Sequence, residues 1–170
     1  MSDLDVQCLT VLQSQKRYQK CLFKRIGTST CTTACNVFIL RMNDNSKRCA
    51  KVIYTNSYNE YVNKYKDLDY IGVVPKLLDY FVTSVESDIG VRTALLLINE
   101  YIEPRDTCVN TNILISKLVT TLHANRYIHS GISQEENVYL RNRYIQEDVL
   151  IDLINNRALF ISIRHILYID

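Results

Sequence analysis

A lysine set in an apolar run is the first residue of this chain that could do chemistry. Lys51 is flanked by Ala50 on one side and by Val52 and Ile53 on the other. An ammonium group is costly to bury unless it meets an acid or phosphate groups. Glu60, in the next segment, is the candidate acid. The alternative is that an alternating strand points Lys51 to water and that Glu60 is a solvated charge on a helix.

A second set of polar residues follows an apolar periodic segment near residue 120. Apolar residues recur there at three- and four-residue spacing, which predicts one helix with an apolar face. They are Ile115, Leu118, Val119 and Leu122. The polar residues at 110–112 can cap the start of this helix. His129 and Gly131 come after it, and Asn137 precedes an apolar run at 138–140 that is expected as a strand.

This order resembles the catalytic loop of the protein kinase superfamily, whose pattern is H-R-D-L-x-x-x-N. The position of the family's aspartate reads Gly131, and its asparagine matches Asn137 only with one extra residue in the loop, because strict spacing reaches Glu136. The aspartate accepts the proton of the substrate hydroxyl, which glycine cannot do. The resemblance implies a kinase-like fold with a degenerate catalytic loop at His129 and Gly131 and no catalytic residue. The alternative here is a helix and a turn with an ordinary surface histidine.

The segments around Lys51 predict a small antiparallel sheet. β-branched and aromatic residues are concentrated in five short runs, with a helical segment between the third and the fourth. The expected strands are 22–27, 36–40, 48–54, 73–81 and 94–101, with the helix at 56–70, a polar turn at 43–46 and a polar excursion at 84–90. The order resembles a kinase N-lobe. It implies an α+β fold: a five-stranded antiparallel sheet plus one helix, followed by a truncated C-lobe fragment of one helix and a β-hairpin.

The kinase resemblance also implies a vestigial nucleotide-binding site. Lys51 matches the lysine of V-A-I-K, which contacts phosphates, and Glu60 matches its acidic partner, with Asp67 as a weaker candidate. The hinge, whose backbone pairs with adenine in the family, falls at 100–102. The family's glycine-rich loop retains only Gly27, so it would cover ATP poorly. The implied site consists of Lys51, Glu60, Glu100, Ile102, Asn137 and Asp152.

Two registers fit the residues after the catalytic loop. In the first, the strand 149–153 ends at the position of the family's D-F-G, so that Asp152 would bind a metal ion. In the second, the strand 149–153 forms a hairpin with 158–163 across two asparagines, because asparagine tolerates the left-handed conformation of such turns. The metal position then falls near Ser162 or Ile163 and carries no carboxylate.

The chain ends at Asp170, where a working kinase continues into an activation loop, an A-P-E segment and a helical substrate-binding subdomain. We therefore expect an N-terminal arm or helix at 1–20, a kinase-like N-lobe at 21–105 and a truncated C-lobe fragment at 106–170. A truncated lobe leaves an apolar face uncovered, and such faces commonly bind proteins. The expected occupant is another protein, or a second copy of the chain in a homo-oligomer.

Composition excludes several classes of partner. The 170 residues are 47% hydrophobic, and 20 basic against 18 acidic residues give a formal net charge of +2. The sequence contains no block of basic residues of the kind that binds nucleic acid or an anionic membrane. No apolar run approaches the roughly 20 residues that span a bilayer. No signal peptide opens the chain, so its six cysteines are expected as reduced thiols in a cytoplasmic or nuclear protein, in the host cell if the source is a virus. Cys31 and Cys35 lack a second pair or a nearby histidine, which favours buried thiols over zinc.

Three functions are compatible with these observations. The first is a non-catalytic regulator that binds an active protein kinase and modulates its activity without a cofactor. The expected effect is stimulation. The compact size and skewed composition, with 12 tyrosines and no tryptophan, are similar to those of baculovirus protein-kinase-interacting proteins, small factors that stimulate a viral kinase. The second is a minimal phosphotransferase that uses ATP and magnesium. The third is an α+β adaptor with no kinase ancestry.

Overall fold

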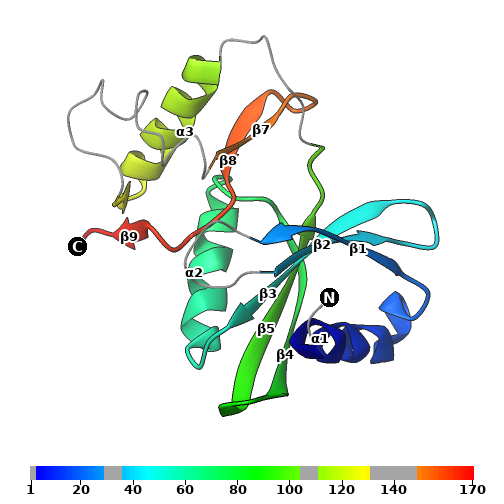
Figure 1. The fold of residues 1–170 in the computed structure, drawn as a ribbon. Helices are drawn as coiled ribbons and strands as arrows, with labels where there is room; N and C mark the ends of the chain where they lie inside the picture. The colour runs from blue at the N-terminus through cyan, green and yellow to red at the C-terminus, as the bar shows by residue number, and fades with distance from the viewer. Residues whose placement is uncertain (1–2, 29–35, 104–110, 131–148) are drawn as a thin grey trace. The chain divides into compact units, whose positions relative to one another are not determined.

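The structure, a computed structural model, is an α+β fold with two compact units (Figure 1). It describes residues 3–28, 36–103, 111–130 and 149–170. The first unit consists of Met1–Asn63 and Leu77–Tyr101, and the second of Lys64–Lys76 and Ile102–Asp170. The expected α+β class, with a five-stranded antiparallel sheet, is confirmed. The boundaries predicted at residues 20 and 105 stay predictions.

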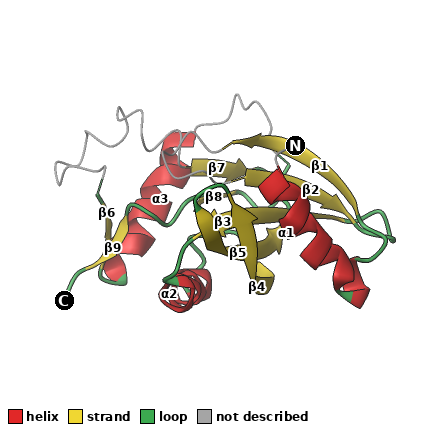
Figure 2. Ribbon diagram, turned by 60° about the horizontal axis from the view of Figure 1, so that its bottom comes forward, coloured by secondary structure: helices red, strands yellow, loops and turns green. Residues whose placement is uncertain are grey.

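The elements of the first unit follow the predicted order. They are α1 (Asp3–Ser14), a short 3-10 helix (Lys16–Tyr18), β1 (Leu22–Thr28), β2 (Asn36–Arg41), β3 (Lys47–Tyr54), β4 (Leu77–Ser87) and β5 (Gly90–Glu100). Helix α2 (Tyr58–Tyr70) lies between β3 and β4 in the chain and belongs by its first half to this unit. The strands form one antiparallel sheet in the order β1-β2-β3-β5-β4, so that β1 and β4 are its two edges (Figure 2).

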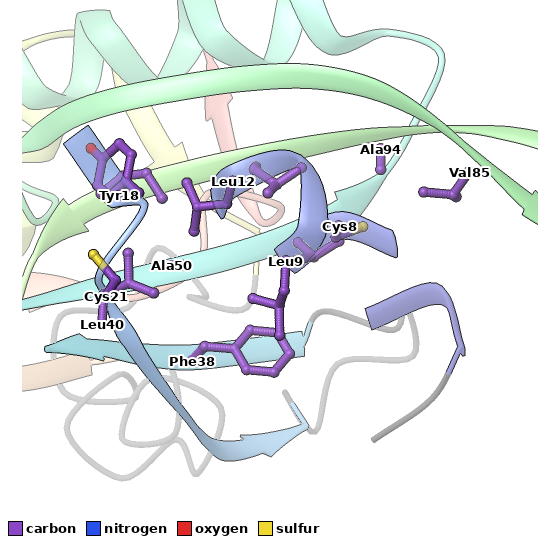
Figure 3. Close-up of a cluster of buried hydrophobic side chains, with 13 residues drawn as sticks. Cys8, Leu9, Leu12, Tyr18, Cys21, Phe38, Leu40, Ala50, Val85 and Ala94 are labelled. Carbon is purple, nitrogen blue, oxygen red and sulfur yellow. The ribbon is translucent and has the colours of Figure 1, made fainter. Parts of the chain in front are cut away.

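Helix α1 covers one face of this sheet and forms the core of the first unit. Its residues Cys8, Leu9 and Leu12 are buried against side chains from β2, β3, β4 and β5 (Figure 3). The sheet residues in this cluster include Phe38, Leu40, Ala50, Val52, Val85, Ala94, Leu96 and Ile98. Because successive strand residues point to opposite faces, the neighbours of these residues, Lys51 among them, lie on the face away from α1. The arm-or-helix segment is therefore a core element of the unit.

Side chains occupy part of the β4 edge of the sheet. Glu86 exchanges two hydrogen bonds with the amide of Gln7 on α1: its backbone N–H donates to Oε1 at 2.9 Å, and its carbonyl accepts from Nε2 at 3.0 Å. Nearer the start of the strand, the backbone N–H of Tyr80 donates to the carboxylate of Asp79 at 3.0 Å. Unpaired backbone groups on an edge strand are a template for pairing with another chain. These bonds remove part of that template from β4.

The second unit is built around helix α3 (Thr111–Ala124). Its other elements are β6 (Tyr127–His129), β7 (Val149–Asp152), β8 (Arg157–Phe160) and β9 (Ile166–Tyr168). The apolar face predicted for α3 is buried, with Leu118 at 5% exposure and Leu122 at 0%, and α3 packs against β8. Strands β7 and β8 form an antiparallel hairpin in which Val149 is opposite Phe160. The predicted helix and hairpin are both present.

Some predicted boundaries are wrong, for physical reasons that the structure shows. Residues 73–76 are not a strand: Val73 is buried in the second unit, where its carbonyl accepts a hydrogen bond from the N–H of Phe160 at 2.8 Å. The polar excursion expected at 84–90 is mostly strand, because β4 continues to Ser87 with Val85 buried at 1% exposure. Only two residues, 88 and 89, form the turn into β5.

Several predictions lie outside the described residues. These are the strand at 138–140, the degenerate loop position Gly131, the asparagine Asn137 with its alternative Glu136, and the Cys31–Cys35 pair. Cys8 and Cys21 are free thiols buried in the first unit, and Cys49 is a free thiol that is half buried. Among the described helices, none is long and apolar enough to cross a membrane.

Candidate functional site

Lys51 lies half buried in the middle of β3. Its cross-strand neighbours are Val37 on β2 and Leu97 on β5, and it shares with them the sheet face away from α1. Cys49 is two residues earlier on the same face; burial raises the pKa of its thiol, and the charge of Lys51 acts in the opposite direction. The lysine therefore has the half-apolar surroundings that the sequence predicted. Whether Lys51 meets phosphate groups or points to water stays open, and its assignment to a nucleotide-binding site stays a prediction.

Glu60 is in the first turn of α2, where its side chain is exposed. Within the described ranges, no ion pair joins Glu60 to Lys51 or to another basic residue. A carboxylate in the first turn also interacts favourably with the helix dipole, which is reason enough for an acid at this position. Asp67, the weaker candidate, is on the part of α2 that belongs to the second unit. The assignment of Glu60 as the partner of Lys51 stays a prediction.

The two hinge residues differ in position. Glu100 ends β5 directly opposite Arg48, and it shares the α1 side of the sheet with Ile98, because strand residues two apart share a face. Lys51 is on the other side. Ile102 is buried at 8% exposure at the start of the second unit. The structure thus does not bring the Glu100 carboxylate to the face of Lys51.

Asp152 is held inside its own hairpin. Its carboxylate is 6% exposed and accepts hydrogen bonds from Nε of Arg157 at 2.9 Å and from Nδ2 of Asn155 at 2.8 Å, and the backbone N–H of Asn155 is 3.4 Å from the other oxygen. Burial alone would raise the pKa of Asp152, but these hydrogen bonds outweigh it and hold the pKa below the usual value of 3.8. Both carboxylate oxygens therefore stabilise the turn between β7 and β8.

His129 is a buried residue of β6, with 1% exposure. Its ring stacks on Phe160 of β8 with the centroids 5.4 Å apart and an angle of 20° between the planes, and the ring of His165 lies 5.6 Å away. The two short strands β6 and β9 pair beside it, with His129 opposite Ile166. The alternative of an ordinary surface histidine is wrong, since the ring is part of the core of the second unit.

Two polar arrangements were missed by sequence reasoning. In the first unit, the hydroxyl of Tyr18 donates to Oδ2 of Asp79 at 3.1 Å and accepts from Nη1 of Arg48 at 3.0 Å, and Arg17 also contacts Asp79 at 3.2 Å. In the second unit, Nζ of Lys64 donates to the carbonyl of Ile163 at 2.9 Å. The partners are 30 to 99 residues apart in the chain. No local sequence signal could have found such pairs.

The described residues contain no group of three or more histidine, cysteine, aspartate or glutamate side chains that could hold a metal ion. Comparison with known proteins adds no relative: no protein-family model matches the chain, and no curated protein matches it. Function must therefore be inferred from the residues and their geometry.

Proposed function

We propose that the chain is a kinase-like regulatory protein that transfers no phosphate itself, binds an active protein kinase and stimulates it through protein contacts. The order of elements supports this proposal: three strands, a helix and two strands precede a second helix and a hairpin. The third strand carries Lys51 within an apolar run, as the kinase pattern requires. The proposal needs no cofactor and no metal ion.

The β7–β8 hairpin is the observation that supports the proposed lack of phosphate transfer. Of the two registers for this region, the one with a hairpin matches the observed pairing of Asp152 with Arg157. In that register the position of the kinase metal ligand falls near Ser162 or Ile163, neither of which has a carboxylate. Phosphoryl transfer in this family depends on magnesium held by that aspartate. A chain without it, and with Gly131 in place of the catalytic aspartate, lacks both acids of the reaction.

Exposed apolar side chains of the second unit support binding to another protein. Leu167, Tyr168 and Ile169, at the end of the chain, are 44 to 56% exposed. Ile154, in the turn of the β7–β8 hairpin, is 76% exposed, and Ile113 on α3 is 55% exposed. Contiguous exposed apolar residues commonly mark surfaces that bind proteins.

The test is a turnover assay with and without the chain. Purified protein is titrated into a panel of active serine/threonine and tyrosine kinases, and incorporation of labelled phosphate into their substrates is measured. The expected result is that the rate of at least one kinase changes with saturation, while the chain alone, supplied with ATP and magnesium, labels neither a generic substrate nor itself. Transfer of phosphate by the chain alone would overturn the proposal, and so would the absence of any change across the panel.

Two variants distinguish contact from chemistry. Lys51→Ala removes the one phosphate-binding candidate on β3 and is expected to leave the effect on the kinase unchanged. A double variant with Leu167→Ser and Tyr168→Ser reduces the exposed apolar surface and is expected to weaken the effect. Its matched control is Tyr70→Ser, because Tyr70 is also an exposed tyrosine, at 93% exposure, but lies on α2.

A second candidate, a minimal ATP-dependent phosphotransferase, is favoured by one observation. Lys51 is half buried in β3, at the position of the lysine that contacts phosphates in the kinase pattern. Magnesium-dependent thermal stabilisation by ATP, lost in Lys51→Ala, would support this function. Phosphate transfer by the wild type that is absent in the same variant would decide between the two.

A further inference from the structure

Charge is distributed unevenly across the five-stranded sheet. Strands β1, β2 and β3 contain six basic residues and no acidic residue: Lys24, Arg25, Arg41, Lys47, Arg48 and Lys51. At the opposite edge, strand β4 and its turn contain Asp79, Glu86 and Asp88 and no basic residue. Edge strand β1 is therefore the basic end of the sheet.

The registers place several of these cations together on one face. Leu22 is opposite Arg41, which is opposite Lys47, so that the three form one row across β1, β2 and β3. Lys24 is two residues after Leu22 and belongs to the same face, which is the face away from α1. Lys24, Arg41 and Lys47 are exposed, and so is Leu22 at 67%. An apolar side chain thus lies among three cations at the margin of the sheet.

Two cations of this face, Lys24 and Arg41, are not neutralised by the nearby acids of the described residues. Asp44, in the turn between β2 and β3, accepts hydrogen bonds from the N–H and the hydroxyl of Ser46. Within the described ranges, neither Lys24 nor Arg41 has an acidic partner. Asp79 pairs with Arg17 and Tyr18 on the other face of the sheet. The charges of Lys24 and Arg41 are available to a ligand.

The backbone of β1 differs from that of β4. Both are edge strands, and an edge strand presents the N–H and C=O groups of alternate residues to whatever lies beside it. On β4, Gln7 and Asp79 occupy groups of this kind at Glu86 and Tyr80. On β1, the regular pairing with β2 runs from Leu22 to Arg25 before a bulge, and no described side chain bonds to this stretch of backbone from outside the sheet.

The geometry points to β1 as the site where an extended acidic segment of a protein partner adds to the sheet as a sixth strand. Its backbone pairs with Leu22–Arg25, its carboxylates contact Lys24 and Arg41, and an apolar residue covers Leu22. Main-chain hydrogen bonds supply affinity in this mode, and alternate side chains supply specificity. A nucleic acid fits less well, because it has no regular ladder of backbone N–H and C=O groups to pair with a strand.

This inference rests on the proposed function for the existence of a protein partner, but a peptide assay tests it separately. The probe is a fluorescent peptide that repeats glutamate–threonine–valine–threonine, so that glutamate and valine alternate on one face of the strand. Its anisotropy is measured against the full chain at low and moderate salt. We expect saturable binding that weakens with salt, no binding of the lysine–valine analogue, and loss of binding when alternate residues of the acidic peptide are N-methylated. N-methylation removes backbone donors without changing charge.

Variants locate the binding surface. The double variant K24E/R41E is expected to bind the acidic peptide at least about tenfold more weakly, because two attractive contacts become repulsive. The matched control is Lys117→Glu, an exposed lysine on α3, which should leave binding unchanged. Circular dichroism of each variant checks that it is folded, and Leu22→Ser serves as a second variant that keeps the charges and should also weaken binding.

Three outcomes would overturn the inference: no binding of the acidic peptide, equal binding by K24E/R41E, or equal binding of the N-methylated peptide. Binding of single-stranded RNA that K24E/R41E abolishes, without binding of the peptide, would assign the surface to nucleic acid instead. Self-association that depends on Lys24 and Arg41 in sedimentation velocity, without peptide binding, would assign it to a second copy. In each case the kinase turnover assay still tests the proposed function by itself.

Discussion

Lys64 of α2 donates a hydrogen bond from Nζ to the backbone carbonyl of Ile163, at a distance of 2.9 Å. Its partner carries no charge, and desolvation lowers the pKa of Lys64 below the usual value of 10.5. Two further bonds involve the loop after α2: the hydroxyl of Tyr65 donates to the carbonyl of Pro75 in this loop at 2.6 Å, and the N–H of Phe160 on β8 donates to the carbonyl of Val73 in the same loop. The second half of α2 is thereby attached to the segment after β8.

Replacing Lys64 with methionine keeps most of the apolar stem and removes the donor. We expect a loss of about 1–2 kcal/mol in the free energy of unfolding, the range for one hydrogen bond from a charged and partly exposed donor. Urea unfolding followed by circular dichroism measures it. Lys117→Met, at an exposed position of α3, is the control and should change stability by a few tenths of a kcal/mol at most.

Comparison of the wild type with Lys64→Met also tests the lowered pKa of Lys64. Because the folded pKa lies below the unfolded value, the unfolded chain binds more protons between the two, and stability rises with pH in that window. The difference in unfolding free energy between wild type and Lys64→Met should therefore shift in favour of the wild type as the pH approaches 10.5 from below. A difference that stays constant with pH would contradict the shift.

Tyr18→Phe tests the polar arrangement that holds the 3-10 helix to the sheet. The hydroxyl connects Asp79 of β4 with Arg48 of β3, and burial together with the negative charge of Asp79 raises the pKa of Tyr18. Removing the hydroxyl takes one hydrogen-bond partner from the Asp79 carboxylate and one from the Arg48 guanidinium. We expect a loss of about 1–2 kcal/mol in the free energy of unfolding. Tyr70→Phe, at an exposed tyrosine, should have no measurable effect on urea unfolding.

Asp152→Asn tests the turn of the β7–β8 hairpin in acid. The pKa of Asp152 is held below 3.8, so its carboxylate stabilises the folded state above that value, and this stabilisation is lost as the pH falls through the folded pKa. Wild type should therefore lose stability relative to Asp152→Asn as the pH falls below about 4. Thermal unfolding of both proteins at a series of acidic pH values measures the difference in stability. A difference that does not change with pH would contradict the lowered pKa.

Gln7→Ala tests the closure of the β4 edge. Without the amide, the N–H and C=O of Glu86 are open to another chain, and an exposed edge favours edge-to-edge association. We expect light scattering and sedimentation velocity to show more self-association than in the wild type. Thr10→Ala is the matched control on the same helix, because the hydroxyl of Thr10 donates within α1, to the carbonyl of Val6, and to no other described residue.

Local patterns of the sequence were sufficient for most elements of this fold. The apolar spacing of α3 and the β-branched content of β2 and β3 predict these elements, since they depend on which residues are close in the chain. The turn between β7 and β8 was also predictable, and Asn156 adopts φ 51° there, a conformation that asparagine tolerates. Strand alternation was likewise enough to separate Lys51 from the buried Ala50 and Val52.

Only the tertiary structure decided which distant groups meet. Strands β6 and β9 have three residues each, too few for a pattern, and they are strands because they pair with one another beside the buried ring of His129. The residues around Val73 have the composition of a strand, but Val73 lies in a loop. Its carbonyl accepts a hydrogen bond from the N–H of Phe160. The sequence also left open two registers for Asp152, one at a metal site and one in its own hairpin. Short-range spacing does not choose between them, whereas the pairing of β7 with β8 does. Such choices follow from packing and from hydrogen bonds between segments far apart in the chain, which no local window contains.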